Sequence, residues 1–179
     1  MVSTHDLLAY GDALTWVPPM VDVSALARLR SRQGGRLRIG HAPTRRSTKS
    51  TDAFLHACSL LDVEVVLIER QRHTDCLKVK GTCDVLYDQV RLGYGLNAVE
   101  AWAMGVPVIA GADEATLARM RAEFGELPFV AATESTIGDA VRLLTDDEVR
   151  DEWATRGHEH AVRWHDGRET VDRLTPIYH

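Results

Sequence analysis

A group of cations and hydroxyls stands between a predicted strand and a predicted helix, over residues 41–51. Arg45, Arg46 and Lys49 bring three positive charges to this turn. The first turn of a helix presents free N–H groups and the positive end of the helix dipole, so added arginine and lysine side chains suit a diphosphate. A solvated basic loop would have the same composition, and the composition alone does not separate the two interpretations.

A second strand-to-helix turn carries glycines and a carboxylate, over residues 88–100. Gly93 and Gly95 allow a ligand to approach the backbone closely, although the third glycine of a dinucleotide fingerprint is missing. The helix that follows is apolar nearly all round between residues 98 and 104, which predicts that it is buried. Glu100 lies in it and therefore needs a partner, either a ribose diol or a neighbouring arginine.

Short apolar segments alternate with helical ones after residue 37. Strands are predicted at 37–42, 63–68, 84–87, 106–110 and 129–131, and helices at 51–61, 73–80, 96–104, 114–122, 135–144, 146–164 and 168–177. This alternation predicts an α/β fold, namely a doubly wound Rossmann-like parallel sheet flanked by helices, with a helical C-terminal tail. Ligands of such sheets bind at the carboxyl ends of the strands, where both turns lie.

The first 36 residues follow a different pattern. A short helix is predicted after Thr4 and a brief strand at 14–17, followed by a Pro18-Pro19 break and a polar linker at 31–36. This segment has too few apolar residues to fold alone. If nothing covers it, apolar side chains will be exposed, and such patches often mark interfaces. The side chains concerned are Leu7, Leu8, Leu14 and Trp16.

Composition excludes several classes of protein. The 179 residues carry a formal charge of −5 with both signs interspersed, which argues against nucleic-acid binding. We expect no membrane span and no cationic signal segment, and hence a cytoplasmic protein. Cys58, Cys76 and Cys83 form no Cys-x-x-Cys pair, so they are predicted to be small core residues rather than disulfides or zinc ligands.

Two helical features near the C-terminus are predicted to be structural. His158, His160 and His165 are expected on a polar surface and not as metal ligands, because they lack the His-Glu-x-x-His order. Trp153 and Trp164 are expected to pack the terminal helix against the domain.

Residues 92–109, Leu-Gly-Tyr-Gly-Leu-Asn-Ala-Val-Glu-Ala-Trp-Ala-Met-Gly-Val-Pro-Val-Ile, resemble the signature of retaining nucleotide-sugar glycosyltransferases of the GT-B architecture (glycosyl transferases group 1). Residues 41–51 resemble the phosphate-binding loop of that family, and residues 83–89 the strand before its signature. Residues 3–8 and 16–22 resemble the connection between its two domains. The resemblance implies that residues 37–179 are the C-terminal, donor-binding domain and residues 1–36 a remnant of the connection.

This family implies a hexosyltransferase-like reaction with a nucleoside-diphosphate sugar, such as a UDP- or GDP-sugar, as donor and without a metal or separate cofactor. Arg45 or Arg46, together with Lys49, would stabilise the leaving diphosphate by electrostatics. The donor itself would be bound by residues of the signature. These are Gly93, Tyr94, Gly95, Leu96 and Glu100.

Two departures from the family pattern bear on activity. Leu92 stands where the family has an acidic residue, so a contact to the donor sugar is missing there. The acceptor half of the GT-B architecture is also missing, and catalysis needs both reactants in one geometry. We therefore expect a partner chain or domain to supply the unknown acceptor site. A non-catalytic nucleotide-sugar-binding or interaction module is the main alternative, ahead of an epimerase and of an unrelated flavodoxin-like binder.

Overall fold

The computed structural model describes residues 1–177, and its six strands form one sheet in the order β2-β1-β3-β5-β4, with β6 also beside β5. The strands are β1 (Leu37–His41), β2 (Val63–Leu67), β3 (Val85–Tyr87), β4 (Leu92–Gly93), β5 (Val108–Ala112) and β6 (Val130–Ala131). All pairs are parallel except β4 with β5. The predicted parallel sheet is confirmed, but the antiparallel β4 was not predicted because its two residues lie inside the glycine-rich turn.

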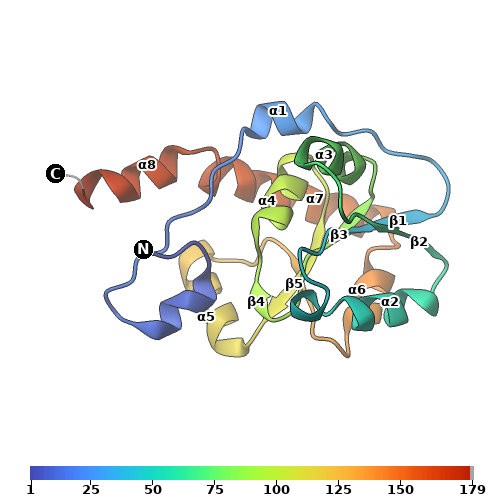
Figure 1. Ribbon diagram of the computed structural model, residues 1–179, viewed down its shortest axis with the longest axis horizontal. Coiled ribbons are helices and arrows are strands. Elements are labelled where there is room, and N and C mark those ends of the chain that lie inside the picture. Colours follow the sequence, from blue (N-terminus) through green and yellow to red (C-terminus); the bar gives the residue numbers. More distant parts are fainter. Residues whose placement is uncertain (178–179) are drawn as a thin grey trace.

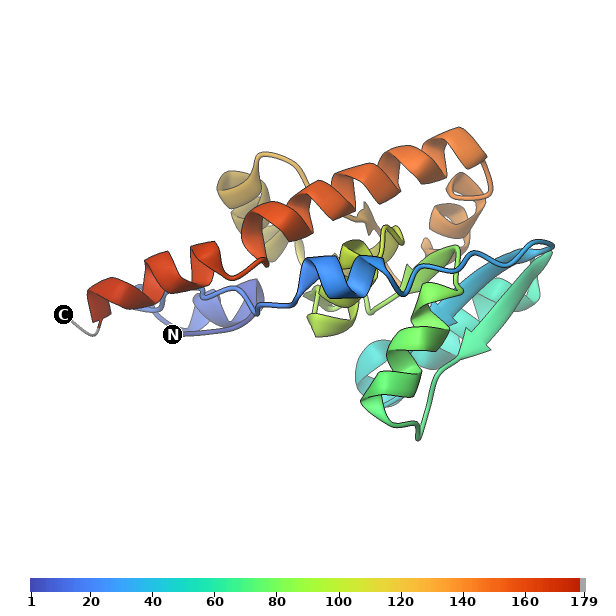
Figure 2. The same ribbon diagram turned by 90° about the horizontal axis from the view of Figure 1, so that it is seen from above.

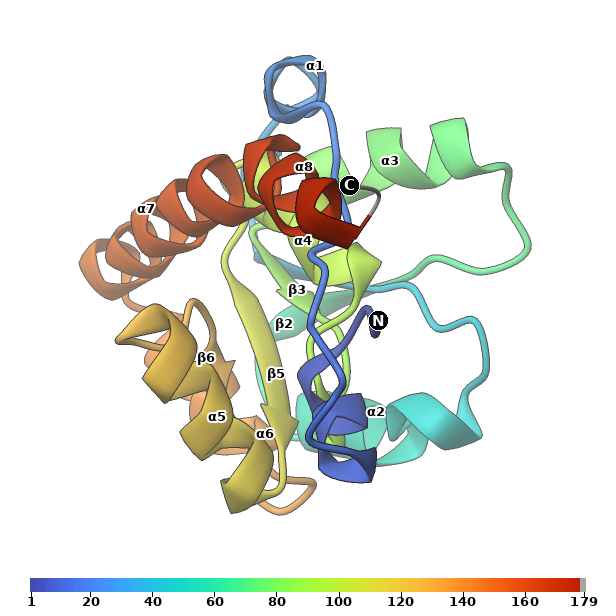
Figure 3. The same ribbon diagram turned by 90° about the vertical axis from the view of Figure 1, so that its left-hand side faces the viewer.

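Helices cover both faces of this sheet (Figures 1 and 3). They are α1 (Val23–Ala27), α2 (Thr51–Ser59), α3 (His73–Gly81), α4 (Leu96–Ala103), α5 (Glu114–Phe124), α6 (Ile137–Leu143), α7 (Asp147–Trp164) and α8 (Arg168–Leu174), with 3-10 turns η1 (His5–Tyr10), η2 (Ser47–Lys49) and η3 (Thr175–Ile177). Figure 3 shows α1, α3, α4 and α7 on one face and α2 and α6 on the other. Within the described residues, no helix is long and apolar enough to cross a membrane.

The central strands are buried on both faces, as continuous apolar runs predict. Successive side chains of a strand point to opposite faces. In β3, Leu86 packs in the cluster beneath α4 and α7, whereas Val85 and Tyr87 pack beneath α2 and α6. In β5, Val108 and Ile109 divide between the two clusters in the same way. The carboxyl ends of these strands are thereby held in fixed positions.

The N-terminal residues do not form the predicted strand. Their only described pairing is an isolated bridge between Val2 and Trp16. The prediction of an exposed Trp16 was wrong: its side chain is 2% exposed, and it packs beside Trp164 and beneath the guanidinium of Arg173. Leu7 remains exposed. Figure 2 shows the reason, because the N-terminal segment runs alongside α8 and the end of α7, which supply the cover that the first 36 residues lack.

Helix α1 was also absent from the prediction. It is one turn long, and the side chain of Asp22 caps it by accepting a hydrogen bond from the N–H of Ala25 at 2.8 Å. Leu26 is buried against α4. A five-residue helix is too short to show a clear apolar period in the sequence, so its packing on α4 decides its conformation.

Helices α4 and α7 approach closely at Gly157. A Cβ atom built there would clash with the buried indole of Trp102, reaching 2.8 Å from its Nε1 and closer still to its Cδ1. Although alanine favours helix by about 1 kcal/mol over glycine, we expect Gly157→Ala to lower the free energy of unfolding by about 1–3 kcal/mol through overpacking. Urea unfolding followed by circular dichroism measures this loss.

Gly138 of α6 provides the matched control. A Cβ atom there meets ordinary contacts, 3.6 Å to Arg142 Nη1 and 3.9 Å to Ala57 Cβ. We therefore expect Gly138→Ala to be neutral or to stabilise by up to about 1 kcal/mol. Equal effects of the two substitutions would contradict the close packing of α4 on α7.

Candidate functional site

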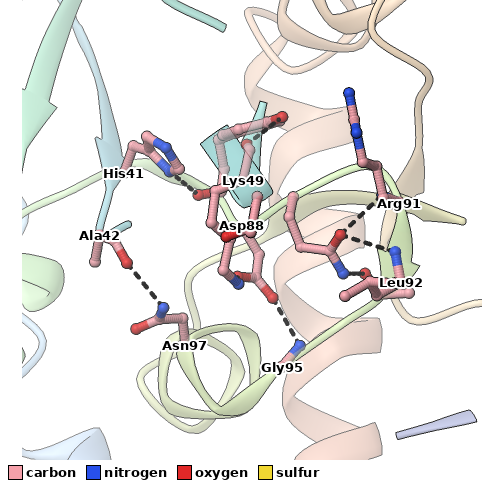
Figure 4. A network of polar contacts seen from close by, with 12 residues as sticks. His41, Ala42, Lys49, Asp88, Arg91, Leu92, Gly95 and Asn97 are labelled. Atoms are coloured by element: carbon pink, nitrogen blue, oxygen red, sulfur yellow. Dashed lines mark hydrogen bonds and ion pairs between the residues drawn. The ribbon is translucent and has the colours of Figure 1, made fainter. Parts of the chain in front are cut away.

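A pocket of about 260 Å³ lies at the carboxyl ends of β1 and β2. Its walls are the loop after β1 (residues 42–44), the loop after β2 (residues 68–71), the start of α3 at His73 and Cys76, and Asn97 of α4. The amide of Asn97 donates to the carbonyl oxygen of Ala42 at 2.9 Å and so joins α4 to the first loop (Figure 4). This is the edge at which ligands of parallel sheets bind, and the two predicted turns meet here.

Lys49 and Gly95 meet at one carboxylate beside this pocket. Lys49 Nζ lies 2.5 Å from Asp88 Oδ1, and the N–H of Gly95 donates to Asp88 Oδ2 at 2.7 Å (Figure 4). The Lys49 side chain is 18% exposed and that of Asp88 is fully buried. Asp88 follows β3 directly, and Gly95 is the N-cap of α4. The structure therefore brings together the predicted cation and the predicted glycine, through an aspartate that the sequence had not singled out.

The two predicted arginines have different surroundings. Arg46 forms two hydrogen bonds to Glu69, at 2.7 and 2.6 Å. This pairing raises the pKa of Arg46 and lowers that of Glu69. Arg45 is exposed, and its side chain has no hydrogen bond or ion pair within residues 1–177. Arg45 is thus the arginine whose charge is available to a ligand.

Glu100 is buried, as the apolar helix predicted, and both of its oxygens are held. Lys80 Nζ, also buried, contacts Oε2 and lies 2.5 Å from Asn97 Oδ1. His73 Nε2 lies 2.7 Å from Oε1, and the His73 side chain is 67% exposed. Within the described residues, the partners of Glu100 are therefore Lys80 and His73. The neighbouring arginine that the sequence suggested as an alternative to a ribose is not one of them. His73, which holds Oε1, also lines the pocket, whereas Glu100 is not among the residues of its walls.

Gln89 shapes the glycine-rich turn. Its side-chain oxygen accepts from the N–H groups of Arg91 and Leu92, both at 2.8 Å, and its amide donates to the carbonyl oxygen of Gly93 at 2.8 Å. Gly93 has a φ of +87°, and a Cβ atom there would clash with the methyl group of Met120. The positive φ favours glycine at this position, and a larger residue would also displace the end of the flexible Met120 side chain.

Tyr94 does not point toward the pocket. Its ring is buried in the core, and its hydroxyl lies 3.3 Å from His160 Nε2 and 3.2 Å from His165 Nε2. Burial raises the pKa of Tyr94 well above its usual value. Only the Tyr94 backbone is therefore in place for the predicted donor contact. Leu96, by contrast, is exposed at the start of α4.

The predicted surface positions of two histidines were wrong. His160 and His165 are buried among aromatic rings, whereas His158 is half-buried and faces the Trp102 carbonyl oxygen at 3.2 Å. The sequence pattern of α7 predicted exposure for these two histidines because they lie among polar residues. In the structure, the N-terminal segment and Phe124 cover that face of the helix. Trp164 packs in the core as predicted. Within the described residues, no group of three histidine, cysteine or acidic side chains could hold a metal ion.

His41 fixes the end of β1 beneath the basic turn. Its Nδ1–H donates to the carbonyl oxygen of Tyr87 at 3.0 Å, so its Nε2 accepts from the hydroxyl of Thr51 at 2.8 Å. Burial lowers the pKa of His41 to about 4, which keeps the ring neutral. The turn is further shaped by Ser50, which has a left-handed φ of 49° and donates to Glu134 at 2.7 Å.

Cysteines behave as small side chains. Cys58 and Cys83 are buried, and burial raises the pKa of each to about 11. Cys76 is half-buried and lines the pocket, so its prediction as a core residue holds only in part.

A larger hollow, of about 730 Å³, lies between α1 and α7. Among the described residues that line it are Asp22 and Asp166 but no lysine or arginine. An anionic ligand would find no positive charge there, so the chemistry places the candidate site in the smaller pocket.

No protein-family profile matches the sequence, and no curated protein does. Solved structures share the fold. The C-terminal domain of the glycosyl transferase group 1 family protein LpcC from Francisella tularensis is 17% identical with a TM-score of 0.56, over 76% of this chain and 96% of that one. Sucrose-phosphate synthase from Thermosynechococcus elongatus is 15% identical with a TM-score of 0.71, over 99% of this chain and 56% of that one.

HepE from Anabaena, in complex with UDP and glucose, is 12% identical with a TM-score of 0.66, over 92% of this chain and 56% of that one. The chain thus spans a little over half the length of these two enzymes. Together with the GT-B signature resemblance of residues 92–109, these likenesses identify the fold. The chain has the Rossmann-like fold of the C-terminal domain of a group 1 glycosyltransferase of the GT-B architecture.

Proposed function

We propose that this chain is the donor-binding domain of a cytoplasmic glycosyltransferase, which binds a nucleoside-diphosphate sugar at the carboxyl ends of the strands, beside the pocket that His73 and Asn97 line. The observation that carries the proposal is that Lys49 and the Gly95 backbone meet at Asp88, at the start of the helix α4 that carries the buried Glu100. Each belongs to a motif that resembles the family. HepE holds UDP and glucose, or UDP-glucose, on the same fold, which makes a UDP-sugar the first donor to test and a GDP-sugar the second.

The diphosphate would lie against Lys49, Arg45 and the N-terminus of α4. An ammonium group, a guanidinium group and backbone N–H groups stabilise the negative charge that develops on a leaving nucleoside diphosphate. Arg45 has no carboxylate partner in the described residues, whereas Arg46 is neutralised by Glu69. We therefore assign the phosphate role to Arg45 and a structural role to Arg46.

The ribose would bind at Glu100. Lys80 holds one carboxylate oxygen from the buried side and keeps the carboxylate oriented. His73 holds the other oxygen from the exposed side. A ribose diol can replace the exposed imidazole as hydrogen-bond donor at small cost, because His73 returns to water. A carboxylate with one fixed and one exchangeable oxygen suits this role.

The acceptor would be held by another domain or chain. One wall of a cleft does not bring two reactants into a reactive geometry. Leu92 and Leu96, which flank the Gly93–Gly95 turn in the sequence, are exposed, and such a partner would contact the chain there. The proposal includes retention of the anomeric configuration of the transferred sugar, because residues 92–109 resemble the signature of retaining enzymes.

A non-catalytic binding module is the second candidate, and Leu92 favours it. Its side chain is 48% exposed and offers no hydrogen bond to a sugar hydroxyl at the position where the resembling family has an acidic residue. Such a module would still bind the nucleotide but would not transfer its sugar.

Calorimetric titration with UDP, GDP and their sugar conjugates tests the proposal. We expect saturable binding of one nucleotide, weakened about tenfold or more by Lys49→Met or Glu100→Gln, since hydrogen bonds to charged groups contribute about 1.5–3 kcal/mol. Lys78→Met is the matched control, because Lys78 is an exposed lysine of α3 whose ion pair is with Asp75 on the same helix and not with Asp88 or Glu100.

Circular dichroism of each variant separates loss of the site from loss of the fold. Binding that is equally weak in the Lys78 variant would show a general charge effect and contradict the site. Absence of binding at millimolar nucleotide in the folded native chain would contradict both the donor-binding domain and the nucleotide-binding module, and would favour an interaction module that binds no nucleotide.

A further inference from the structure

The Asp88 carboxylate accepts hydrogen bonds from the two groups that the proposed function assigns to the donor phosphates. One oxygen accepts from Lys49 Nζ at 2.5 Å and the other from the Gly95 N–H at 2.7 Å. Both contacts are visible in Figure 4. The Asp88 side chain is fully buried, so these partners replace water entirely. Geometrically, this carboxylate stands where an oxyanion of a ligand would stand.

The arrangement is specific to this aspartate. A Cβ atom built on Gly95 would lie 3.5 Å from Asp88 Oδ2 and 3.8 Å from Lys49 Nζ. The carboxylate, the ammonium group and the start of α4 thus occupy one small volume. A phosphate entering it would meet a fixed negative charge at short range, and like charges brought together oppose binding. Lys49 cannot pair fully with the Asp88 carboxylate and with a phosphate at the same time.

We propose that Asp88 is an internal anion that occupies the phosphate position and limits the affinity of the site for nucleoside diphosphates. This inference rests on the proposed function, because it assigns a competitor to the same diphosphate subsite. To bind, the donor phosphates must replace Asp88 as the hydrogen-bond acceptor of Lys49 and of the Gly95 N–H, or share these two donors with Asp88. Asp88 would then determine how much donor is needed before the site fills.

Substitution of Asp88 by asparagine should change the affinity for the diphosphate. Asp88→Asn keeps the size of the side chain and leaves an oxygen for the Gly95 N–H, but it removes the negative charge and frees the Lys49 ammonium group. We expect affinity for the diphosphate to rise by about tenfold or more, because a like-charge contact is replaced by a neutral one. The gain should vanish in the double variant Asp88→Asn/Lys49→Met.

Asp84→Asn is the matched control. Asp84 is a buried aspartate at the opposite end of β3, where it accepts from the Arg38 N–H at 2.9 Å and pairs with Arg32. It loses the same charge and a comparable set of hydrogen bonds. Its distance along the strand places it away from the pocket, so its nucleotide affinity should equal that of the native chain.

The test is calorimetric titration of the native chain and these variants with UDP, GDP and inorganic pyrophosphate, with melting curves to confirm that each is folded. Tighter binding by Asp88→Asn alone supports the proposal, and a similar gain with pyrophosphate locates the effect at the phosphates. Native binding that is unchanged or weaker in folded Asp88→Asn overturns it and leaves the proposed function standing. No binding by native, Asp88→Asn or Asp84→Asn protein overturns both.

Discussion

Lys80→Met is expected to lower the free energy of unfolding by about 3–5 kcal/mol, and Glu100→Met by a similar amount, because each leaves one buried charge without its partner. The ammonium and carboxylate groups contact each other inside the protein, and both side chains are nearly inaccessible to water. The double variant Lys80→Met/Glu100→Met should cost less than either single change. Methionine stems fill the space, and no charge remains buried.

Urea unfolding of the four proteins measures this coupling. Lys78→Met, an exposed change on the same helix, should shift stability by no more than about 0.5 kcal/mol. Additive losses in the double variant would show that Lys80 and Glu100 act independently and would contradict the pair. A folded double variant also provides a protein without the Glu100 carboxylate, in which loss of nucleotide binding is not a result of unfolding.

Acidification between pH 6.5 and about pH 4 is expected to destabilise the fold steeply, before most carboxylates are protonated. His5, His160 and His165 lie together around the Tyr94 ring. Their pKa values are lowered to about 4, about 2 and about 4, mainly by burial and, for His5 and His160, also by neighbouring positive charge from Arg173 or the other histidines. Unfolded histidines have a pKa near 6.5. Below that pH the unfolded chain binds protons that the folded chain does not.

The stabilisation from these neutral histidines is therefore complete above pH 6.5 and is lost as the pH falls. His41, whose pKa burial also lowers to about 4, contributes in the same way. With these four groups, the slope of unfolding free energy approaches about 5 kcal/mol per pH unit at its steepest. Melting curves from pH 8 to pH 4.5 measure it. His160→Phe removes one of the four groups and should make the slope shallower by about a quarter, whereas exposed His56→Gln serves as the control. A melting temperature that stays constant from pH 7 to pH 5 would contradict the prediction.

Local patterns in the sequence predicted most of the regular structure. The nearly continuous apolar run at 63–68 identified the parallel edge strand β2, which is mostly half-buried, and the run at 106–110 identified the buried strand β5. The apolar helix around Glu100 predicted its burial. Local patterns failed where cover came from distant residues. The sequence around Trp16 predicts an exposed side chain, but the end of α7 and helix α8 cover it. The sequence around His160 predicts a surface residue, but Phe124 covers it.

The sequence by itself determined the kind of sheet and the glycine-rich turn that leads to Glu100, and the edge at which a ligand would bind stays a prediction from it. Tertiary structure alone decided which charges remain free. Lys49 meets Asp88 across 39 residues and Lys80 meets Glu100 across 20. No periodicity relates such positions, because the sheet topology brings them together. A charge in a low-dielectric interior takes the nearest partner that the fold provides, and at this site that partner is another side chain.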